Sequence, residues 1–371
     1  MSAAVLRRKR SVLRTLAATL AGVVALAAAS APPVAAAPPA NAGRQATVMT
    51  YNLYLGANLQ PLFAATPATV AGLAQDVWDH VEQVDFPLRA QAIARQIDEF
   101  DPGVIGLQEV ALWERGSSAA ALAPVYDFQQ ILLDALAARG ERYRTVSTSR
   151  NFQSPPVPLA SGGVARFTDR DVIIVRDGEP ASVLKVSNPR AALFTARIPL
   201  PNPVLGSVEI VRGWASVDVK VRGRSFRFVD THLEAFSPDV RARQAVELAA
   251  ILAPAPVPVV LVGDLNSVPT DVGGAYGILT GALGLADAWV AVHGAAGGDT
   301  SGQTDDLNLP ESRLDHRIDY VLYQPTVIEA VEADVVGEEQ ADRTPPLPGA
   351  PFGLWPSDHA GVVATLHVSW P

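Results

Sequence analysis

Short runs of apolar residues recur along this 371-residue chain and predict β-strands. Clusters of Gly, Pro, Asn, Asp and Ser, which are typical of turns, separate many of them. No fixed period relates one run to the next, so a repeat architecture is not expected. The runs occupy residues 46–53, 104–110, 171–175, 191–198, 208–221, 225–233, 257–262, 318–323 and 360–368.

Apolar residues at three- and four-residue spacing predict helices between some of these strands. One set follows Pro87, and another precedes Gly140, a residue type that commonly ends helices. A third helix is expected over residues 238–252, before a proline-rich bend. Many strands with interspersed helices and no long linker indicate one α+β domain of packed sheets over residues 46–371. The set after Pro87 is Ala90, Ile93, Ile97 and Phe100, and the set before Gly140 is Phe128, Ile131, Leu132 and Leu136.

The N-terminal segment has the pattern of a secretory signal peptide. Five basic residues precede an apolar run over residues 16–29, and small residues follow through position 37. The run has 14 residues, short of the roughly 20 that span a bilayer, so no transmembrane anchor is expected. We therefore predict a signal peptide over residues 1–37, a flexible lead-in over residues 38–45, and a secreted protein.

Composition narrows the chemistry. The chain has no cysteine, which excludes disulfides, thiol nucleophiles, iron–sulfur clusters and Cys-ligated zinc. It carries 29 basic and 38 acidic residues, a net charge of −9. Residues 1–40 hold five basic and no acidic side chains, so the remainder has 24 basic and 38 acidic ones and a net charge of −14. Such a protein repels polyanions unless a basic groove or a divalent cation intervenes.

Six apolar strands end in polar groups that a hydrophobic core would exclude. Strand ends of this kind, repeated six times, indicate one shared polar site. Read one at a time, Asp264 and Asn266 also fit turn chemistry, and Asp319 also fits a buried partner for Arg317. The polar ends are Asn52, Gln108–Glu109, Asp230–His232, Asp264–Asn266, Asp319 and Asp358–His359.

These residue types suit a metal-assisted reaction at phosphorus. Carboxylates and amide oxygens are hard ligands for Mg²⁺ or Mn²⁺, whereas zinc favours imidazole or thiolate. Histidines beside carboxylates supply a base for water and a donor for developing negative charge, as phosphodiester hydrolysis requires. No lysine follows a glycine-rich turn and no Gly-x-Ser-x-Gly occurs, which argues against a phosphate-loop ATPase and an α/β-hydrolase esterase.

The same motifs, in order, resemble the endonuclease/exonuclease/phosphatase superfamily. That superfamily includes secreted DNases, abasic-site endonucleases, inositol-polyphosphate 5-phosphatases and bacterial sphingomyelinases. The resemblance covers residues 46–371 and implies a four-layer αββα sandwich, with two mixed β-sheets packed face to face and helices outside. The motifs are Tyr51-Asn52-Leu53, Gln108-Glu109-Val110, Asp230-Thr231-His232-Leu233, Gly263-Asp264-Leu265-Asn266, Arg317-Ile318-Asp319-Tyr320 and Ser357-Asp358-His359.

The resemblance also implies a metal-ligand set and a histidine held by a carboxylate. Glu109 would be the principal metal ligand, supported by Asn52 and Asp358. His359 would act as general base or phosphate partner, with its tautomer fixed by Asp319.

The remaining motif residues would act on the water and the phosphate. Asp264 and Asn266 would position the attacking water and the scissile phosphate, and His232 would donate to a non-bridging oxygen. Whether His359 or Asp264 takes the proton stays open. Further candidates for phosphate contact, in the region where relatives place such a side chain, are Arg166, Arg170 and Asp171.

The substrate is less well determined, because loops rather than the scaffold select it. Segments 54–86 and 340–356 carry Phe and Trp residues that could enter a lipid interface transiently, stack on bases, or fold back on the core. We favour a phospholipid or a small organic phosphodiester. The alternatives are an extracellular nuclease and, in another class, a secreted binding protein without catalysis. No partner protein is inferred.

Overall fold

The computed structural model describes residues 45–202 and 204–369. The predicted signal peptide, and the lead-in up to residue 44, lie outside the described residues. Strand β1 begins at Gln45. Within the described ranges, every helix is too short or too polar to cross a bilayer.

The first sheet has nine strands and is mixed. Its one parallel pair joins β1 to β2, and the other pairs are antiparallel. Strands β5 (Tyr143–Gln153) and β6 (Val157–Pro158) pair with β7. The main order is β16 (Ile328–Val336), β17 (Gly361–Val368), β1 (Gln45–Asn52), β2 (Val104–Gln108), β7 (Val164–Arg176), β3 (Leu112–Gly116) and β4 (Ala123–Asp127).

The second sheet has six strands and repeats this plan. Its one parallel pair joins β12 to β13, and the others are antiparallel. Strands β9 (Ile198–Asn202) and β10 (Gly206–Ile210) form a separate hairpin between β8 and β11 in the chain. The order in the sheet is β14 (Ala286–Asp287), β15 (Asp319–Tyr323), β13 (Val259–Asp264), β12 (Arg224–His232), β11 (Gly213–Val221) and β8 (Leu184–Leu193).

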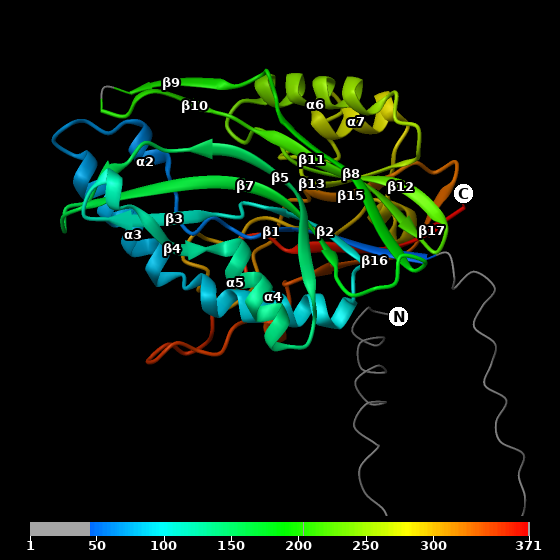
Figure 1. The fold of residues 1–371 in the computed structure, drawn as a ribbon, viewed down its shortest axis with the longest axis horizontal. Coiled ribbons are helices and arrows are strands. Elements are labelled where there is room, and N and C mark those ends of the chain that lie inside the picture. The colour runs from blue at the N-terminus through cyan, green and yellow to red at the C-terminus, as the bar shows by residue number, and fades with distance from the viewer. Residues whose placement is uncertain (1–44, 203, 370–371) are drawn as a thin grey trace, which may run out of the picture. The chain divides into compact units, whose positions relative to one another are not determined.

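Helices cover the outer faces of both sheets, and the predicted four-layer sandwich is confirmed. In Figure 1, α6 and α7 lie on one side of the stacked sheets, and α3, α4 and α5 lie on the other. Short helices α2 (Gln60–Phe63) and α8 (Ala288–His293) complete the fold. The longer helices are α3 (Val70–Gln83), α4 (Phe86–Phe100), α5 (Phe128–Ala138), α6 (Pro238–Leu252) and α7 (Ala275–Leu283).

Three hydrophobic layers separate the four structural layers. Val48 of β1 and Val262 of β13 belong to the cluster between the sheets, whereas Met49 of β1 packs toward Ile93 of α4. A third cluster joins the second sheet to α6 and α7. Successive side chains of a strand point to opposite faces, so the central strands are apolar on both faces. This explains the continuous apolar runs in the sequence.

Several elements differ from those expected from the sequence. The run 208–221 is two strands, β10 and β11, separated at Val211 and Arg212. Of the run 191–198, only residues 191–193 belong to β8, and Ile198 begins β9. Strands β3, β4, β5, β6, β14 and β16 and helices α2, α3, α7 and α8 were not predicted. Strand β5 is polar along most of its length, with the sequence YRTVSTSRNFQ, so its apolar signal is weak.

A buried arginine ties α4 to two loops that leave the sheets. Arg89 is fully buried, and its guanidinium donates to the carbonyls of Leu53 and Pro356 at 2.8 Å each and of Tyr54 at 3.1 Å. Its Nε donates to the Val84 carbonyl at 2.8 Å. Leu53 follows Asn52 in the chain, and Pro356 lies two residues before Asp358. Arg89 therefore holds two predicted site residues in place without entering the site.

We predict that Arg89→Met destabilises the fold. It would leave several buried carbonyls without a donor, at a cost of about 1–3 kcal/mol each. We expect a loss of about 3 kcal/mol or more in the free energy of unfolding, measured by urea denaturation. The control is Arg139→Met, which removes a partly exposed ion pair with Asp98 and should cost less than about 1 kcal/mol. Equal losses in the two variants would contradict this role.

Candidate active site

The two parallel strand pairs end side by side at the site. In the first sheet Asn52 lies opposite Gln108, which Glu109 follows, and in the second sheet His232 lies opposite Asp264. The Asn52 amide Nδ2 donates to Asp264 Oδ2 at 3.2 Å, which links the two sheets. The ends of the central strands of both sheets therefore meet at one place.

All eight predicted site residues come together there. A cavity of about 290 Å³ opens at the sheet ends. Asn52 and Asp319 are buried next to it, and each contacts a residue of its lining. The predicted residues in the lining are Glu109, His232, Asp264, Asn266, Asp358 and His359.

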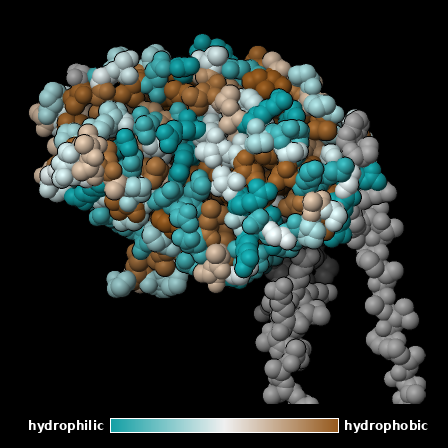
Figure 2. All heavy atoms as spheres, viewed as in Figure 1, coloured by the Kyte–Doolittle hydropathy of each residue, from teal (hydrophilic) through white to brown (hydrophobic). Residues whose placement is uncertain are grey.

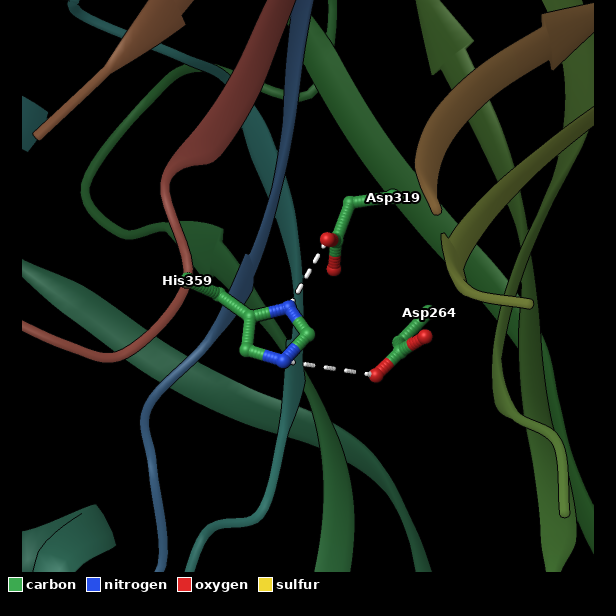
Figure 3. A group of neighbouring side chains, drawn as sticks. All are labelled: Asp264, Asp319 and His359. Atoms are coloured by element: carbon green, nitrogen blue, oxygen red, sulfur yellow. Dashed lines mark hydrogen bonds and ion pairs between the residues drawn. The ribbon is translucent and has the colours of Figure 1, made fainter. Parts of the chain in front are cut away.

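His359 lies between two carboxylates, as Figure 3 shows. Its Nδ1 is 2.8 Å from Asp319 Oδ2, and its Nε2 is 3.9 Å from Asp264 Oδ2. Thr300 donates to the same Asp319 oxygen at 2.6 Å. Burial lowers the pKa of His359, but the Asp319, Asp358 and Asp264 carboxylates outweigh burial and raise that pKa well above its usual value. Burial raises the pKa of Asp264 to about 7, with Asp319 adding to the rise and His359 opposing it.

His232 is held as a neutral hydrogen-bond donor. Arg212 Nη1 lies 3.1 Å from His232 Nδ1, and because arginine can only donate, Nδ1 must accept. The ring proton is then on Nε2, which lies 3.4 Å from Asp264 Oδ2. Burial, Arg212 and His359 together lower the pKa of His232 well below its usual value. The imidazole therefore offers an N–H to the cavity.

Glu109 and Asp358 form an acidic pair that suits a hard cation. Burial raises the pKa of Glu109 to about 8, and the nearby Asp358 and Asp169 carboxylates contribute. Glu109 Oε2 accepts from the Leu55 amide at 2.7 Å, and its backbone has a φ of 54°, an uncommon conformation for a residue other than glycine. Burial also raises the pKa of Asp358. A divalent cation would relieve the repulsion between these carboxylates.

A second group of residues has metal-compatible spacing. One potential ligand atom each from Asp264, Asp319 and His359 lies within 4.8 Å of the others. The hydrogen bond from His359 to Asp319 uses one of these nitrogens. The raised pKa of His359 favours the protonated ring, which cannot ligate a metal. Glu109 and Asp358 make no ion pair among the described residues, so they form a second candidate site for a cation.

The structure adds one cation and two acids to the predicted site. Arg212, Asp169 and Asp305 also line the cavity. Arg212 is 11% exposed and lies 3.5 Å from Asp169. Arg212 falls between β10 and β11, inside a run read as one strand, so no sequence signal marked it.

The further candidates for phosphate contact have other roles, and none of them lines this cavity. Arg166 forms two hydrogen bonds with Glu114. Arg170 donates to the Val110 carbonyl and to Asp127. Asp171 is fully buried. Arg212 is the arginine that reaches the cavity.

The two loops fold back on the core over much of their length. Segment 54–86 contains α2 and α3, and Trp78 is 1% exposed against Trp113. Trp355 of segment 340–356 is 0% exposed. These two tryptophans therefore cannot enter a lipid interface in this conformation. Phe63 remains at the cavity, where its ring meets that of Phe236 edge to face at 6.2 Å.

The sequence also matches a known protein family. The sequence matches the Endonuclease/Exonuclease/phosphatase family over residues 49–359, so the chain belongs to that family, which is named for enzymes that cleave phosphoric esters. Among curated proteins, no sequence matches the chain.

Solved structures show the same fold. A family member from Bacteroides thetaiotaomicron is 17% identical, with a TM-score of 0.53, over 87% of this chain and 97% of that one. A mannosyl-6-phosphatase from the same organism is 18% identical, with a TM-score of 0.53, over 86% and 99%. A protein from Beutenbergia cavernae is 24% identical, with a TM-score of 0.52, over 88% and 72%.

We predict that Asp171→Asn makes the fold less sensitive to rising pH. Burial, Asp169 and Asp230 raise the pKa of Asp171 well above its usual value. A raised acid pKa gives stability that is present below about pH 4 and is lost as pH rises through the folded-state pKa. The stability of the variant relative to the natural protein should therefore rise with pH between pH 4 and pH 8, by at most about 1.4 kcal/mol per pH unit for one proton. Urea denaturation across this range measures it.

The matched control for this experiment is Asp76→Asn, at an exposed position of α3. It should leave the pH dependence of unfolding close to that of the natural protein. If Asp171→Asn behaved in the same way, burial of a charge at this position would not limit stability.

Proposed function

We propose that this protein is an exported, divalent-metal-dependent phosphodiester hydrolase. The observation that carries the proposal is the placement of the Asp319–His359 pair beside Asp264, in one cavity with Glu109 and Asp358. Membership of the family makes phosphoric ester cleavage the expected chemistry. The basic, apolar and small-residue pattern of residues 1–37 supports export.

The acidic pair would hold Mg²⁺ or Mn²⁺. Glu109 and Asp358 would be ligands, and the Asn52 amide oxygen would support them. Asn52 is held at both ends, by Asp264 and by the Tyr54 amide, so its position is fixed. When bound, the cation supplies positive charge for phosphate oxygens and lowers the pKa of water.

The remaining residues would handle the water and the phosphate. Asp264 would take the proton, because the pKa of about 7 matches the pH of catalysis near neutrality. His359, held by Asp319, would contact a phosphate oxygen as a cation.

His232 and Asn266 would act on the other side of the phosphate. His232 would donate from Nε2 as negative charge develops. Asn266 donates to the Leu233 carbonyl at 3.0 Å, which fixes its amide at the cavity wall.

The charges in the cavity favour a small substrate over nucleic acid. Among the described residues, its lining includes five carboxylates, on Glu109, Asp169, Asp264, Asp305 and Asp358, and one arginine. One phosphate can be accommodated with a bound cation, but flanking phosphates of a polynucleotide would meet uncompensated acid. A small organic phosphodiester, or a phospholipid headgroup, avoids this repulsion.

We expect hydrolysis to depend on a divalent metal and to favour small diesters. Bis(p-nitrophenyl) phosphate should be cleaved faster than plasmid DNA or mannose 6-phosphate at equal phosphate concentration, and sphingomyelin tests the lipid option. EDTA should abolish turnover, and Mg²⁺ or Mn²⁺ should restore it. A non-catalytic binding protein would bind without turnover before and after chelation. Faster cleavage of DNA would support the nuclease alternative instead.

Glu109→Gln should weaken metal-dependent turnover with the fold intact. Loss of the carboxylate removes several kcal/mol of stabilisation, so kcat/KM should fall by about 10²–10³-fold at low Mg²⁺ and recover partly at high Mg²⁺. The control is Glu99→Gln at an exposed position of α4, which should behave like the natural protein. A Mg²⁺ titration of both variants gives the comparison, and equal curves would remove Glu109 from the metal site.

His359→Ala should lower kcat by about 10²–10⁴-fold, the range for a catalytic proton or charge donor. Asp319→Asn should give a smaller loss, because the imidazole remains but its Nδ1 hydrogen loses a charged acceptor. Steady-state kinetics on the bis-aryl diester with saturating metal measure both. A His359→Ala enzyme with near-natural kcat would refute its assignment.

A further inference from the structure

We propose that an apolar pocket beside the active-site cavity binds a short alkyl group of the substrate. This inference rests on the proposed hydrolysis of phosphoric esters and adds the class of group that the ester carries. The occupant is one soluble, monomeric phosphodiester that has an apolar group of a few carbons on one of its oxygens.

The pocket lies between the β9–β10 hairpin, the α2–α3 segment and one end of strands β5 and β7. The hairpin contributes Leu200, Leu205 and Val208, and the α2–α3 segment contributes Leu62 and Val77 among others. Its free volume is about 50 Å³.

The pocket lies next to the active-site cavity, and the two share part of their walls. Leu59, Phe63, Phe152 and Phe167 line both. In the proposed binding mode, a phosphodiester with its phosphate at Glu109 and His359 directs one ester group past these four side chains. Phe236, which is 50% exposed, also lines the active-site cavity and packs against Phe63.

Polar atoms of the pocket wall are already hydrogen-bonded within the protein. Arg166 is paired with Glu114 at 2.6 and 2.7 Å. Asn202 donates to the Phe63 carbonyl at 3.0 Å and accepts from the Val204 and Leu205 amides. Ser154 donates to the Pro155 carbonyl and accepts from the Phe167 amide. The wall therefore offers an occupant apolar contact, and a nucleobase would lose hydrogen bonds there.

The size of the pocket limits the occupant. An engineered apolar cavity of about 150 Å³ binds benzene, so a pocket of about 50 Å³ holds the end of a short chain. A full acyl chain would not fit in it. The face drawn in Figure 2 has hydrophobic residues interspersed with hydrophilic ones.

The test is a series of p-nitrophenyl alkyl phosphodiesters with methyl, propyl, butyl, hexyl and octyl groups, used below their aggregation concentrations with Mg²⁺. We expect kcat/KM to rise about fourfold per methylene over the first few carbons, the value of burying one methylene, and then to level off. Equal kcat/KM across the series would overturn the proposal. Turnover of long-chain lipid in vesicles, with no chain-length effect on the monomeric diesters, would overturn it as well.

Variants of Leu205 change the room in the pocket. Leu205→Phe should flatten the ratio of hexyl to methyl kcat/KM, whereas Leu205→Ala should move the plateau to longer chains. The control is Val272→Phe, at a position 81% exposed and outside both linings, which should leave the whole series unchanged. If both Leu205 variants and the control have the same ratio of hexyl to methyl kcat/KM as the natural protein, the pocket does not bind the alkyl group.

A binding measurement separates this proposal from the proposed function. Calorimetric titration with methyl phosphate and hexyl phosphate needs no turnover. We expect hexyl phosphate to bind at least tenfold more tightly than methyl phosphate, and this difference should be lost in Leu205→Phe. That result supports the pocket even if no diester is hydrolysed. Absence of hydrolysis would refute only the proposed hydrolase function. Equal affinities for the two phosphates would overturn the pocket while leaving hydrolysis in place.

Discussion

The hydrogen bond from Asn52 to Asp264 joins the two sheets at the point where the site forms. Each partner ends a strand of the one parallel pair in its own sheet, so the bond forms only if both sheets keep register and stacking. A slip of one residue would turn every side chain of a strand to the opposite face. The packed layer between the sheets, including Val48 and Val262, prevents such a slip. The geometry of the site is therefore a property of the whole sandwich.

The site concentrates negative charge that the protein only partly neutralises. Arg212 lies beside Asp169 and His232, and His359 lies between Asp264 and Asp319. Glu109 and Asp358 have no comparable cationic partner within hydrogen-bonding distance among the described residues. Burial of unpaired carboxylates is costly, and a divalent cation offsets that cost. The same excess of acid that favours a metal disfavours substrates with several phosphates.

The sequence was informative where physical constraints are local. Strand ends such as Asn52 and Asp264 are visible because polar residues interrupt apolar runs, and α6 was predicted with its observed bounds. Strand β5 was missed because it is stabilised by pairing with β7 and not by its own apolar pattern. Arg212 was missed because it lies in the short connection between β10 and β11 and contacts His232, which is distant in the sequence. Tertiary contacts of this kind leave no periodic signal.

The β9–β10 hairpin lines both the apolar pocket, through Leu200 and Val208, and the active-site cavity, through Ile210. Strands β8 and β11 are antiparallel neighbours that a short turn could connect, but the chain inserts this hairpin between them. The insertion places Leu205 in the apolar pocket. Two residues after β10 ends, Arg212 lies against His232. A shift of the hairpin would therefore move a pocket wall and the group that fixes the His232 tautomer together. Because the proposed catalytic residues lie at the ends of strands and the hairpin lies outside both large sheets, such an insertion is where selectivity for one ester can arise.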